Sequence, residues 1–370
     1  MQIVVAGLSI TSSWGNGHAT TYRSLLRALA ARGHRILFLE RDMPWYADNR
    51  DLPRPSFCSL GLYSSLDDLM QRYAAEVARA DLAIVGSYVP EGIAVGDWVL
   101  AQGRGVRAFY DIDTPVTLAA LAEGRCEYLS RAQLPRYDLY LSFTGGPTLT
   151  HLEEEYGSPA ARPLYCSFDP SAYFPEKTSH HWDLGYMGTY SPDRQPTLDR
   201  LLVEVAKRQR DQRFVVAGPL YPESLSWPEN VLRIDHIAPQ QHRSFYSAQR
   251  FTLNVTRADM IERGYSPSVR LFEAAACGVP ILSDVWPGLE HFFEPGREIV
   301  FAEQGAEVED ALQRYSPAEA RRIGARARRR VLQAHSAMHR AIELESYMEG
   351  LSSGASKPSR NASAALRVAP

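Results

Sequence analysis

A segment near residue 270 combines the start of a helix with a single carboxylate. Residues 264–284 have the sequence GYSPSVRLFEAAACGVPILSD. Ser266 followed by Pro267 is typical of a helix start, where proline lacks an N–H group that would have no partner there. The backbone N–H groups of Ser268 and Val269 would then point out of the helix end, where the macrodipole favours a phosphate group.

Glu273 lies further along this predicted helix, about 9 Å from its start at roughly 1.5 Å per residue. That length is similar to the span from the diphosphate to the ribose of a nucleotide. A carboxylate can accept hydrogen bonds from both hydroxyls of a vicinal diol. Three alanines (274–276) let the helix lie close to a sheet. Gly278 ends the helix, and Pro280 opens the next strand. The alternative is a capped surface helix with one solvated glutamate.

Arg194 is a second candidate for contact with an anion. It follows Ser191 and Pro192, which form another helix start, so it would lie in a first helical turn. A cation is disfavoured there by the helix dipole unless an anion is bound, and a diphosphate would supply that anion. The alternative is an exposed arginine on a long helix. Arg270 is a further diphosphate candidate, unless it points to solvent.

The loop after the first apolar run contains an incomplete dinucleotide motif. In LSITSSWGNGHATTY (8–22), Gly15 and Gly17 are followed by a threonine where G-x-G-x-x-G requires its third glycine. Eight residues also separate the strand from Gly15, which is long for the tight pyrophosphate turn. Glu40 does supply the expected acid, so NAD-dependent redox chemistry stays open. His18 is a candidate for one of three roles: a general base, a group that orients a donor phosphate, or a cap of the first helix.

The stretch FYDIDTPVTL places Asp111 and Asp113 at the end of a predicted strand. A carboxylate there can deprotonate an acceptor hydroxyl, and Asp113 is our first choice, ahead of Asp111 and His18. Alternatively, Asp113 or Thr114 caps the next helix. The pair also matches the metal-binding D-x-D of GT-A glycosyltransferases and the D-x-D-x-T of haloacid-dehalogenase-type phosphatases, although Pro115 stands where the latter have threonine.

These residues need a scaffold, and the chain supplies apolar strand-length runs that alternate with amphipathic helices. This alternation predicts parallel sheets covered on both faces. The main predicted helices are Tyr22–Arg32, Leu66–Arg79, Thr197–Arg208, Pro317–Ala334 and Ala337–Met348. The predicted strands are Ile3–Ala6, Arg35–Leu39, Leu82–Val85, Val106–Tyr110, Leu139–Phe143, Leu184–Gly188, Phe214–Ala217, Val231–Ile234, Phe251–Val255, Pro280–Leu282 and Ile299–Ala302.

We therefore predict an α/β protein with two doubly wound, Rossmann-like domains that face a central cleft. The first spans residues 1–166 and the second 183–350, with a linker at 167–182 and a disordered tail at 351–370. Ligands of such sheets bind beyond the carboxyl ends of the strands, where the strand order reverses. On the rim of the first domain, Glu91 and Gly145 lie in strand-end loops, and with Gly15 and Gly17 they are expected to shape an acceptor pocket.

Composition narrows the class of partner. The 370 residues carry a net charge of −3, which provides no global positive field for nucleic acid. The basic run 320–330 leaves contact with an anionic membrane or nucleic acid open, although such a run usually forms a solvated helix face. None of the four cysteines forms a C-x-x-C pair, which favours a reducing cytoplasm and no structural zinc. No apolar run is long enough to span a membrane.

The segment SVRLFEAAACGVPILSD resembles the donor-site helix of glycosyl transferases group 1, and is most similar to their CgeB-like (spore-maturation protein-like) branch. Weaker matches include DIDTP (111–115), SFTGG (142–146), SFDPSAYFP (167–175) and YMGTYSPDRQP (186–196). The resemblance implies GT-B architecture with a C-terminal helix that crosses back. It also implies metal-independent transfer of a sugar from a nucleotide sugar, with a UDP-sugar favoured, and no other cofactor.

The resemblance also assigns roles to residues of the second half. Glu273 would bind the ribose, and His236 and Ile237, in the turn after a strand, would hold the base through backbone groups. Many group 1 enzymes carry a second glutamate eight positions before the ribose-binding one, where this chain has Tyr265. That departure leaves the donor sugar open and allows an inactive nucleotide-sugar-binding protein. A sugar-nucleotide epimerase of the same fold is another alternative, and the acceptor is unknown.

Overall fold

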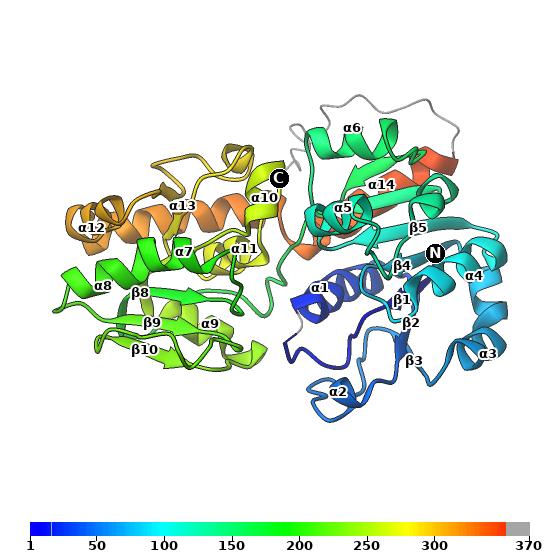
Figure 1. Cartoon of the computed structure of the whole chain (residues 1–370), viewed down its shortest axis with the longest axis horizontal. Helices are drawn as coiled ribbons and strands as arrows, with labels where there is room; N and C mark the ends of the chain where they lie inside the picture. The colour runs from blue at the N-terminus through cyan, green and yellow to red at the C-terminus, as the bar shows by residue number, and fades with distance from the viewer. Residues whose placement is uncertain (16, 353–370) are drawn as a thin grey trace.

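In the computed structural model, which describes residues 1–15 and 17–352, the chain forms two lobes, each built around one parallel sheet (Figure 1). The N-terminal sheet has the order β3-β2-β1-β4-β5-β6-β7. Its strand order therefore reverses between β1 and β4. The strands are β1 Gln2–Gly7, β2 Arg35–Arg41, β3 Ser59–Tyr63, β4 Leu82–Gly86, β5 Val106–Asp111, β6 Leu139–Ser142 and β7 Ala161–Pro163.

The C-terminal sheet has the order β10-β9-β8-β11-β12-β13, so its strand order reverses between β8 and β11. Every strand pair in both sheets is parallel. The prediction of two doubly wound, Rossmann-like domains is confirmed. The strands are β8 Trp182–Met187, β9 Phe214–Ala217, β10 Val231–Ile234, β11 Gln249–Asn254, β12 Ile281–Ser283 and β13 Val300–Phe301.

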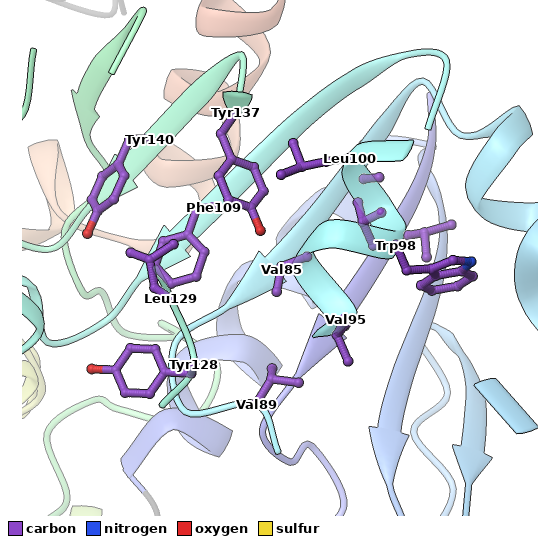
Figure 2. Close-up of a cluster of buried hydrophobic side chains, with 14 of the residues drawn as sticks. Val85, Val89, Val95, Trp98, Leu100, Phe109, Tyr128, Leu129, Tyr137 and Tyr140 are labelled. Atoms are coloured by element: carbon purple, nitrogen blue, oxygen red, sulfur yellow. The ribbon is translucent and has the colours of Figure 1, made fainter. Parts of the chain in front are cut away.

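Helices cover both faces of each sheet, as apolar parallel strands require. Figure 2 shows one such layer in the N-terminal domain, where Val95, Trp98 and Leu100 of α4 pack near Val85 and Phe109 of the sheet. The helices of this domain are α1 Gly17–Ala31, α2 Pro44–Ala47, α3 Leu66–Arg79, α4 Gly92–Gln102, α5 Thr114–Ala122 and α6 Pro147–Glu154. The later helices are α7 Gln195–Leu198, α8 Glu204–Arg208, α9 Pro239–Ser247, α10 Ala258–Arg263, α11 Val269–Ala276, α12 Gly305–Arg314, α13 Pro317–Ala334 and α14 Ala337–Ser352.

The sequence patterns missed the two edge strands of the N-terminal sheet. β3 has only five residues, one of them glycine, and β7 has three. An edge strand pairs on one side only and is buried less completely, so it lacks the continuous apolar run that identified the central strands. The predicted helix Thr197–Arg208 is observed as α7 and α8, joined by a π-helical turn at Asp199–Val203.

The last helix crosses back to the first domain, as the resemblance implies. α14 packs against α1, and its Ala341 and Leu344 are buried in the core beneath the N-terminal sheet. Glu345 forms an ion pair with Arg32 of that domain, and its carboxylate lies 2.6 Å from His34 Nε2. α14 includes the first two residues of the predicted tail 351–370, and the rest of the tail lies outside the described residues. Within residues 1–15 and 17–352, no helix has the length and apolar character needed to cross a membrane.

Candidate functional site

The carboxyl edges of the two sheets meet at one junction. The Gly145 amide, after β6, donates a hydrogen bond to the Tyr265 carbonyl oxygen at 3.0 Å, and the hydroxyls of Thr144 and Ser266 lie 2.5 Å apart. α10 packs against α5 across the same junction (Figure 1). The strand-order reversals of both domains therefore lie on facing edges, which is where doubly wound sheets bind ligands.

The α11 helix begins two residues later than predicted. Its N-cap is Ser268, not Ser266, and the Ser266 hydroxyl instead contacts Thr144 of the other domain. The Ser268 hydroxyl donates to Asn254 Oδ1 at 2.7 Å, so it does not cap the helix itself. The first N–H groups of α11, beginning with Val269, have no intrahelical acceptor. The later start shortens the axial distance to Glu273 to about 6 Å.

Glu273 is buried, with 4% of its surface exposed, so the alternative of a solvated surface glutamate is wrong. The Tyr246 hydroxyl donates to Glu273 Oε2 at 3.3 Å. Burial raises the pKa of Glu273 to about 7, although hydrogen bonds from Tyr173 and Tyr246 and the charge of Arg270 oppose the rise. The carboxyl group is therefore held on a closely packed helix by the Tyr246 hydroxyl of α9.

His242 links this carboxyl group to the turn predicted to hold a base. Its Nε2 lies 3.2 Å from the Ile237 carbonyl oxygen, which can only accept, so Nε2 carries a proton. Its Nδ1 lies 3.1 Å from the Tyr173 hydroxyl and 4.0 Å from Glu273 Oε2. Burial lowers the pKa of His242 to about 4, which keeps the ring neutral. His236 is exposed in the same turn, while Ile237 is half-buried.

Arg270 is buried at the ends of β8 and β11 rather than pointing to solvent. Its Nε donates to the Met187 carbonyl oxygen, and one terminal nitrogen donates to Asn254 Oδ1 at 2.9 Å. A Cβ on Gly188 would lie 2.9 Å from the other terminal nitrogen, so glycine leaves room for the guanidinium. The side chain thus lies at the strand-order reversal of the C-terminal sheet.

Arg194 lies in the loop after β8 and is the N-cap residue of α7, one position before the helix. A terminal nitrogen donates to the Thr189 carbonyl oxygen at 2.5 Å. Its Nε is buried and has no hydrogen-bond partner in the described parts of the chain. The predicted helix start at Ser191 is observed as a turn, with α7 beginning at Gln195.

A buried polar cluster at this edge was missed from the sequence. Asn254 ends β11, and Asp284 follows β12. Asp284 accepts hydrogen bonds from the Thr256 amide at 2.6 Å and the Thr256 hydroxyl at 2.8 Å, and burial raises its pKa. Asn254 donates to Ser283 and accepts from Ser268 and Arg270, so it joins β12 to α11. The available signal was a polar residue at the end of each apolar strand.

On the facing edge, Asp111 and Asp113 have different environments. Asp111 is fully buried and accepts hydrogen bonds from the hydroxyls of Tyr140 and Thr117. Figure 2 shows the Tyr140 hydroxyl, with that of Tyr128, directed away from the apolar cluster. Burial raises the pKa of Asp111 to about 6, against these hydrogen bonds. Asp111 therefore supports the strand end instead of facing the second domain.

Asp113 occupies the N-cap position of α5, but its side chain makes no capping hydrogen bond. Its carboxylate accepts from the Tyr88 hydroxyl at 3.3 Å and lies 3.9 Å from His18 Nε2. Arg257 of the second domain approaches it to 4.0 Å. The carboxylate thus lies at the junction, 20% exposed. The described residues contain no group of three metal-ligating side chains.

Glu40 does not face a ligand. It is fully buried and accepts hydrogen bonds from the loop after β1, including the Ile10 amide at 2.7 Å and the Thr11 hydroxyl at 2.6 Å. A dinucleotide site needs this carboxylate for the ribose. Here both of its oxygens hold the loop that leads to His18, on the first turn of α1.

The remaining predicted rim residues are dispersed. Gly15 and Gly17 are exposed with open space around them. Glu91 is exposed and pairs with Arg41. Gly145 is instead part of the contact between the domains, and a Cβ there would lie 1.9 Å from the Tyr165 hydroxyl.

Tyr265 also belongs to the contact between the domains. It adopts a left-handed backbone conformation with φ 50°. Its ring lies so close to Gly146 and Gly288 that a Cβ on either glycine would come within 2.5 Å of it. Its amide and carbonyl groups both make backbone hydrogen bonds. This position therefore holds the two edges together.

Comparisons with known proteins agree with this architecture. A family model described as "Glycosyl transferase-like" matches residues 194–346, which include Arg194, β11 and α11. Among solved structures, sucrose-phosphate synthase from Thermosynechococcus elongatus has a TM-score of 0.69 at 16% identity, over 96% of this chain and 100% of that one. A comparison with curated proteins gave no match.

Two other similar structures contain nucleotide sugars. Anabaena HepE in complex with UDP-glucose has a TM-score of 0.66 at 13% identity, covering 95% of this chain and 100% of that one. An alpha-glucosyltransferase in complex with UDP-glucose and DNA containing an abasic site has a TM-score of 0.69 at 14% identity, covering 94% and 99%. The chain has the GT-B fold of these glycosyltransferases.

Proposed function

We propose that this protein transfers a sugar from a nucleotide sugar to an acceptor hydroxyl, without a metal ion. The observation that carries this proposal is the arrangement of Arg270, Arg194 and the start of α11 at the strand-order reversal of the C-terminal sheet, opposite Asp113. A buried arginine beside the N–H groups at the start of a helix suits a diphosphate. A carboxylate facing it suits an acceptor hydroxyl.

The donor would lie along α11, with its diphosphate at Ser268, Val269, Arg194 and Arg270. The ribose hydroxyls would reach Glu273. The base would lie near the backbone of His236 and Ile237, and the contact of Ile237 with His242 couples the base turn to the ribose carboxyl group. Similar structures bind UDP and UDP-glucose, so we favour a UDP-hexose and a hexosyl transfer.

In the proposed reaction, the acceptor oxygen forms a bond to the anomeric carbon of the sugar. The bond from that carbon to the diphosphate oxygen breaks, and its electron pair leaves with the nucleoside diphosphate. The acceptor proton passes to Asp113, with His18 as the next choice of base. Arginines and helix N–H groups stabilise the charge that develops on the leaving diphosphate, which is the part a metal ion takes in other glycosyltransferases.

The resemblance to the CgeB-like branch also belongs to this proposal, because the family match covers residues 194–346 without distinguishing branches. The acceptor stays open among glycans, proteins, small metabolites and modified DNA. Dinucleotide redox chemistry is disfavoured, since both oxygens of Glu40 accept hydrogen bonds from the loop after β1. For the metal-dependent D-x-D alternative, Asp111 would have to leave its buried hydrogen bonds to Tyr140 and Thr117.

A second candidate is a protein that binds a nucleotide sugar without turnover. It is favoured by Tyr265, which replaces a carboxylate of related enzymes and packs between Gly146 and Gly288. A donor-sugar contact from this position would have to come from the tyrosine ring or hydroxyl. Nucleotide binding without cleavage of any donor would favour this candidate over the transferase.

The test is a thermal-shift screen with UDP-glucose and other UDP-, GDP-, dTDP- and CMP-sugars, followed by an assay for release of the nucleotide. We expect one donor to raise Tm in a concentration-dependent manner and to release its nucleotide slowly, with water as the acceptor. Release should persist in EDTA. Complete loss in EDTA with rescue by Mn²⁺ would contradict the metal-independent mechanism, and a Tm rise with NAD alone would contradict the transferase.

A further inference from the structure

Arg257 joins the two domains at the proposed site, and no sequence pattern singled it out. It lies between β11 and α10, just beyond the strand-order reversal of the C-terminal sheet. Its terminal nitrogen is 4.0 Å from Asp113 Oδ2 in the N-terminal domain. Its Nε is 3.8 Å from Asp193 Oδ2 in the C-terminal domain. One cation thus lies between two carboxylates that belong to different domains.

The contacts of Arg257 are loose compared with other arginines of the chain. Arg23 binds Asp51 through two hydrogen bonds of 2.7 and 2.8 Å, and Arg107 binds Asp138 at 2.8 Å. Among the described residues, the Arg257 side chain donates no hydrogen bond, and its buried Nε has no hydrogen-bond partner. A guanidinium has five N–H donors, so this one keeps its capacity for a two-point contact with another anion.

Both carboxylates keep other partners if Arg257 moves. Asp193 Oδ2 accepts the Ala258 amide at 3.0 Å, and the Ser191 hydroxyl donates to its other oxygen. Asp113 retains the Tyr88 hydroxyl at 3.3 Å and has His18 nearby. The Arg257 side chain is 34% exposed. Exchange of one anion for another therefore leaves no buried carboxylate unpaired.

We propose that Arg257 couples donor binding to the release of Asp113. Arg257 lies between Asp113 and Asp193, and an entering diphosphate competes for it because a bidentate phosphate contact is stronger than an ion pair at 4 Å. Transfer of Arg257 to the diphosphate removes a cation from Asp113, which makes that carboxylate a better proton acceptor. The acceptor base thus becomes available only when a donor is present. This inference rests on the proposed function.

The test is a double-mutant cycle on the affinity for the tightest-binding of UDP, GDP and dTDP, measured by calorimetry. Arg257→Gln should weaken binding roughly 10- to 100-fold, the effect of losing a charge-assisted contact. Asp113→Asn should tighten binding about two- to fivefold, as expected when a competing exposed ion pair is lost. In the Arg257→Gln background, Asp113→Asn should have no effect.

Two control variants separate the possible outcomes. Asp97→Asn removes an exposed carboxylate that pairs with Arg136 on the N-terminal domain, and it should leave the affinity unchanged. Asp193→Asn leaves Arg257 in place and should also tighten binding, which keeps the proposal testable if Arg257→Gln does not fold. Equal tightening by Asp113→Asn in both backgrounds would indicate general electrostatics and overturn the coupling.

Different results would overturn the coupling and the proposed function. Wild-type affinity in Arg257→Gln overturns the coupling while the donor site stands. Absence of binding of all three nucleotides to the wild-type protein overturns the proposed function itself.

Discussion

The two edges that meet at the junction are built differently. On the C-terminal edge, Arg270, Glu273 and Asn254 are buried. Arg270 donates hydrogen bonds to the Met187 carbonyl oxygen and to Asn254, and Glu273 accepts one from Tyr246. On the N-terminal edge, the buried carboxylates Asp111 and Glu40 support strand ends and loops. Side chains held on helices and strands are fixed more firmly than side chains on loops.

This difference fits a division of labour. A nucleotide offers the same diphosphate and ribose to every enzyme that uses it, so a rigid edge is suited to hold it. Acceptors vary, and variable ligands are usually recognised by loops on a constant scaffold. Asp113 belongs to the second kind of position, at a loop between β5 and α5. Variants on each edge test whether the two edges have these separate roles.

The largest effect is expected for Asp113→Asn on the acceptor edge. The amide has nearly the same size but cannot take the acceptor proton, so turnover should fall roughly 10²- to 10⁴-fold. Nucleotide binding should not weaken, because the donor is held on the facing edge. The measurement is the rate of transfer at saturating donor, beside nucleotide affinity for the same variant. Unchanged turnover would move the assignment of the base to His18.

The second prediction compares the buried carboxyl groups of the two edges through the pH dependence of stability. Burial raises the pKa of Glu273 to about 7 and that of Asp111 to about 6. Between about pH 4 and its folded pKa, each group is therefore protonated in the folded state and ionised in the unfolded state. The stability that each contributes is full below about pH 4 and is lost as pH rises through its folded pKa, by about 3 kcal/mol.

Glu273→Gln and Asp111→Asn should each remove the loss of stability that the replaced carboxyl group causes as pH rises. His242, with its pKa lowered to about 4, changes stability in the opposite direction, so the informative quantity is the difference between variant and wild type. Urea unfolding at several pH values from 4.5 to 8 measures it. The Glu273→Gln difference should extend to about pH 7, and that of Asp111→Asn should end near pH 6. Parallel curves of stability against pH for variant and wild type would show that these carboxyl groups do not have a raised pKa in the folded state.

The smallest of the three effects is expected for nucleotide affinity. Glu273→Gln should weaken the binding of UDP or of the preferred nucleotide by roughly 10- to 100-fold, because an amide cannot accept both ribose hydroxyls as a carboxylate does. Asp111→Asn is the matched control, since it neutralises an equally buried carboxyl group on the other edge. Its affinity should equal that of the wild type. Equal loss in both variants would mean that the effect is one of general destabilisation.

Sequence patterns predicted the rigid edge better than the loops. The central strands and α11 follow from continuous apolar runs and from helix stop signals such as Gly278. The predicted helix start at Ser266 is wrong by two residues, and the Ser266 hydroxyl instead contacts Thr144 of the other domain. A contact between residues so distant in sequence leaves no local signal. The edge strands β3 and β7 were missed for a related reason, since their short segments depend on the neighbouring strand.

The candidate site shows the same limit. Glu273, Arg270 and Asp113 stand out because each is a charged residue in a helix or at a strand end. Arg257 has no such signal, and its position becomes meaningful only when Asp113 and Asp193 are seen on either side of it. The strand-end loop of Gly145 predicts an acceptor pocket, whereas in the structure the hydrogen bond from Gly145 to Tyr265 joins the domains.

The most direct test of a donor site on the C-terminal edge is amide hydrogen exchange with and without UDP-glucose, or the preferred donor of the screen. Bound donor should slow exchange in the loop 187–194, in residues 254–258 and at the start of α11, while residues 8–15 of the N-terminal loop change little. NAD should slow exchange in none of these segments. Protection confined to residues 8–15 and the end of β2, with no change around α11, would contradict the assignment of the donor to the C-terminal domain.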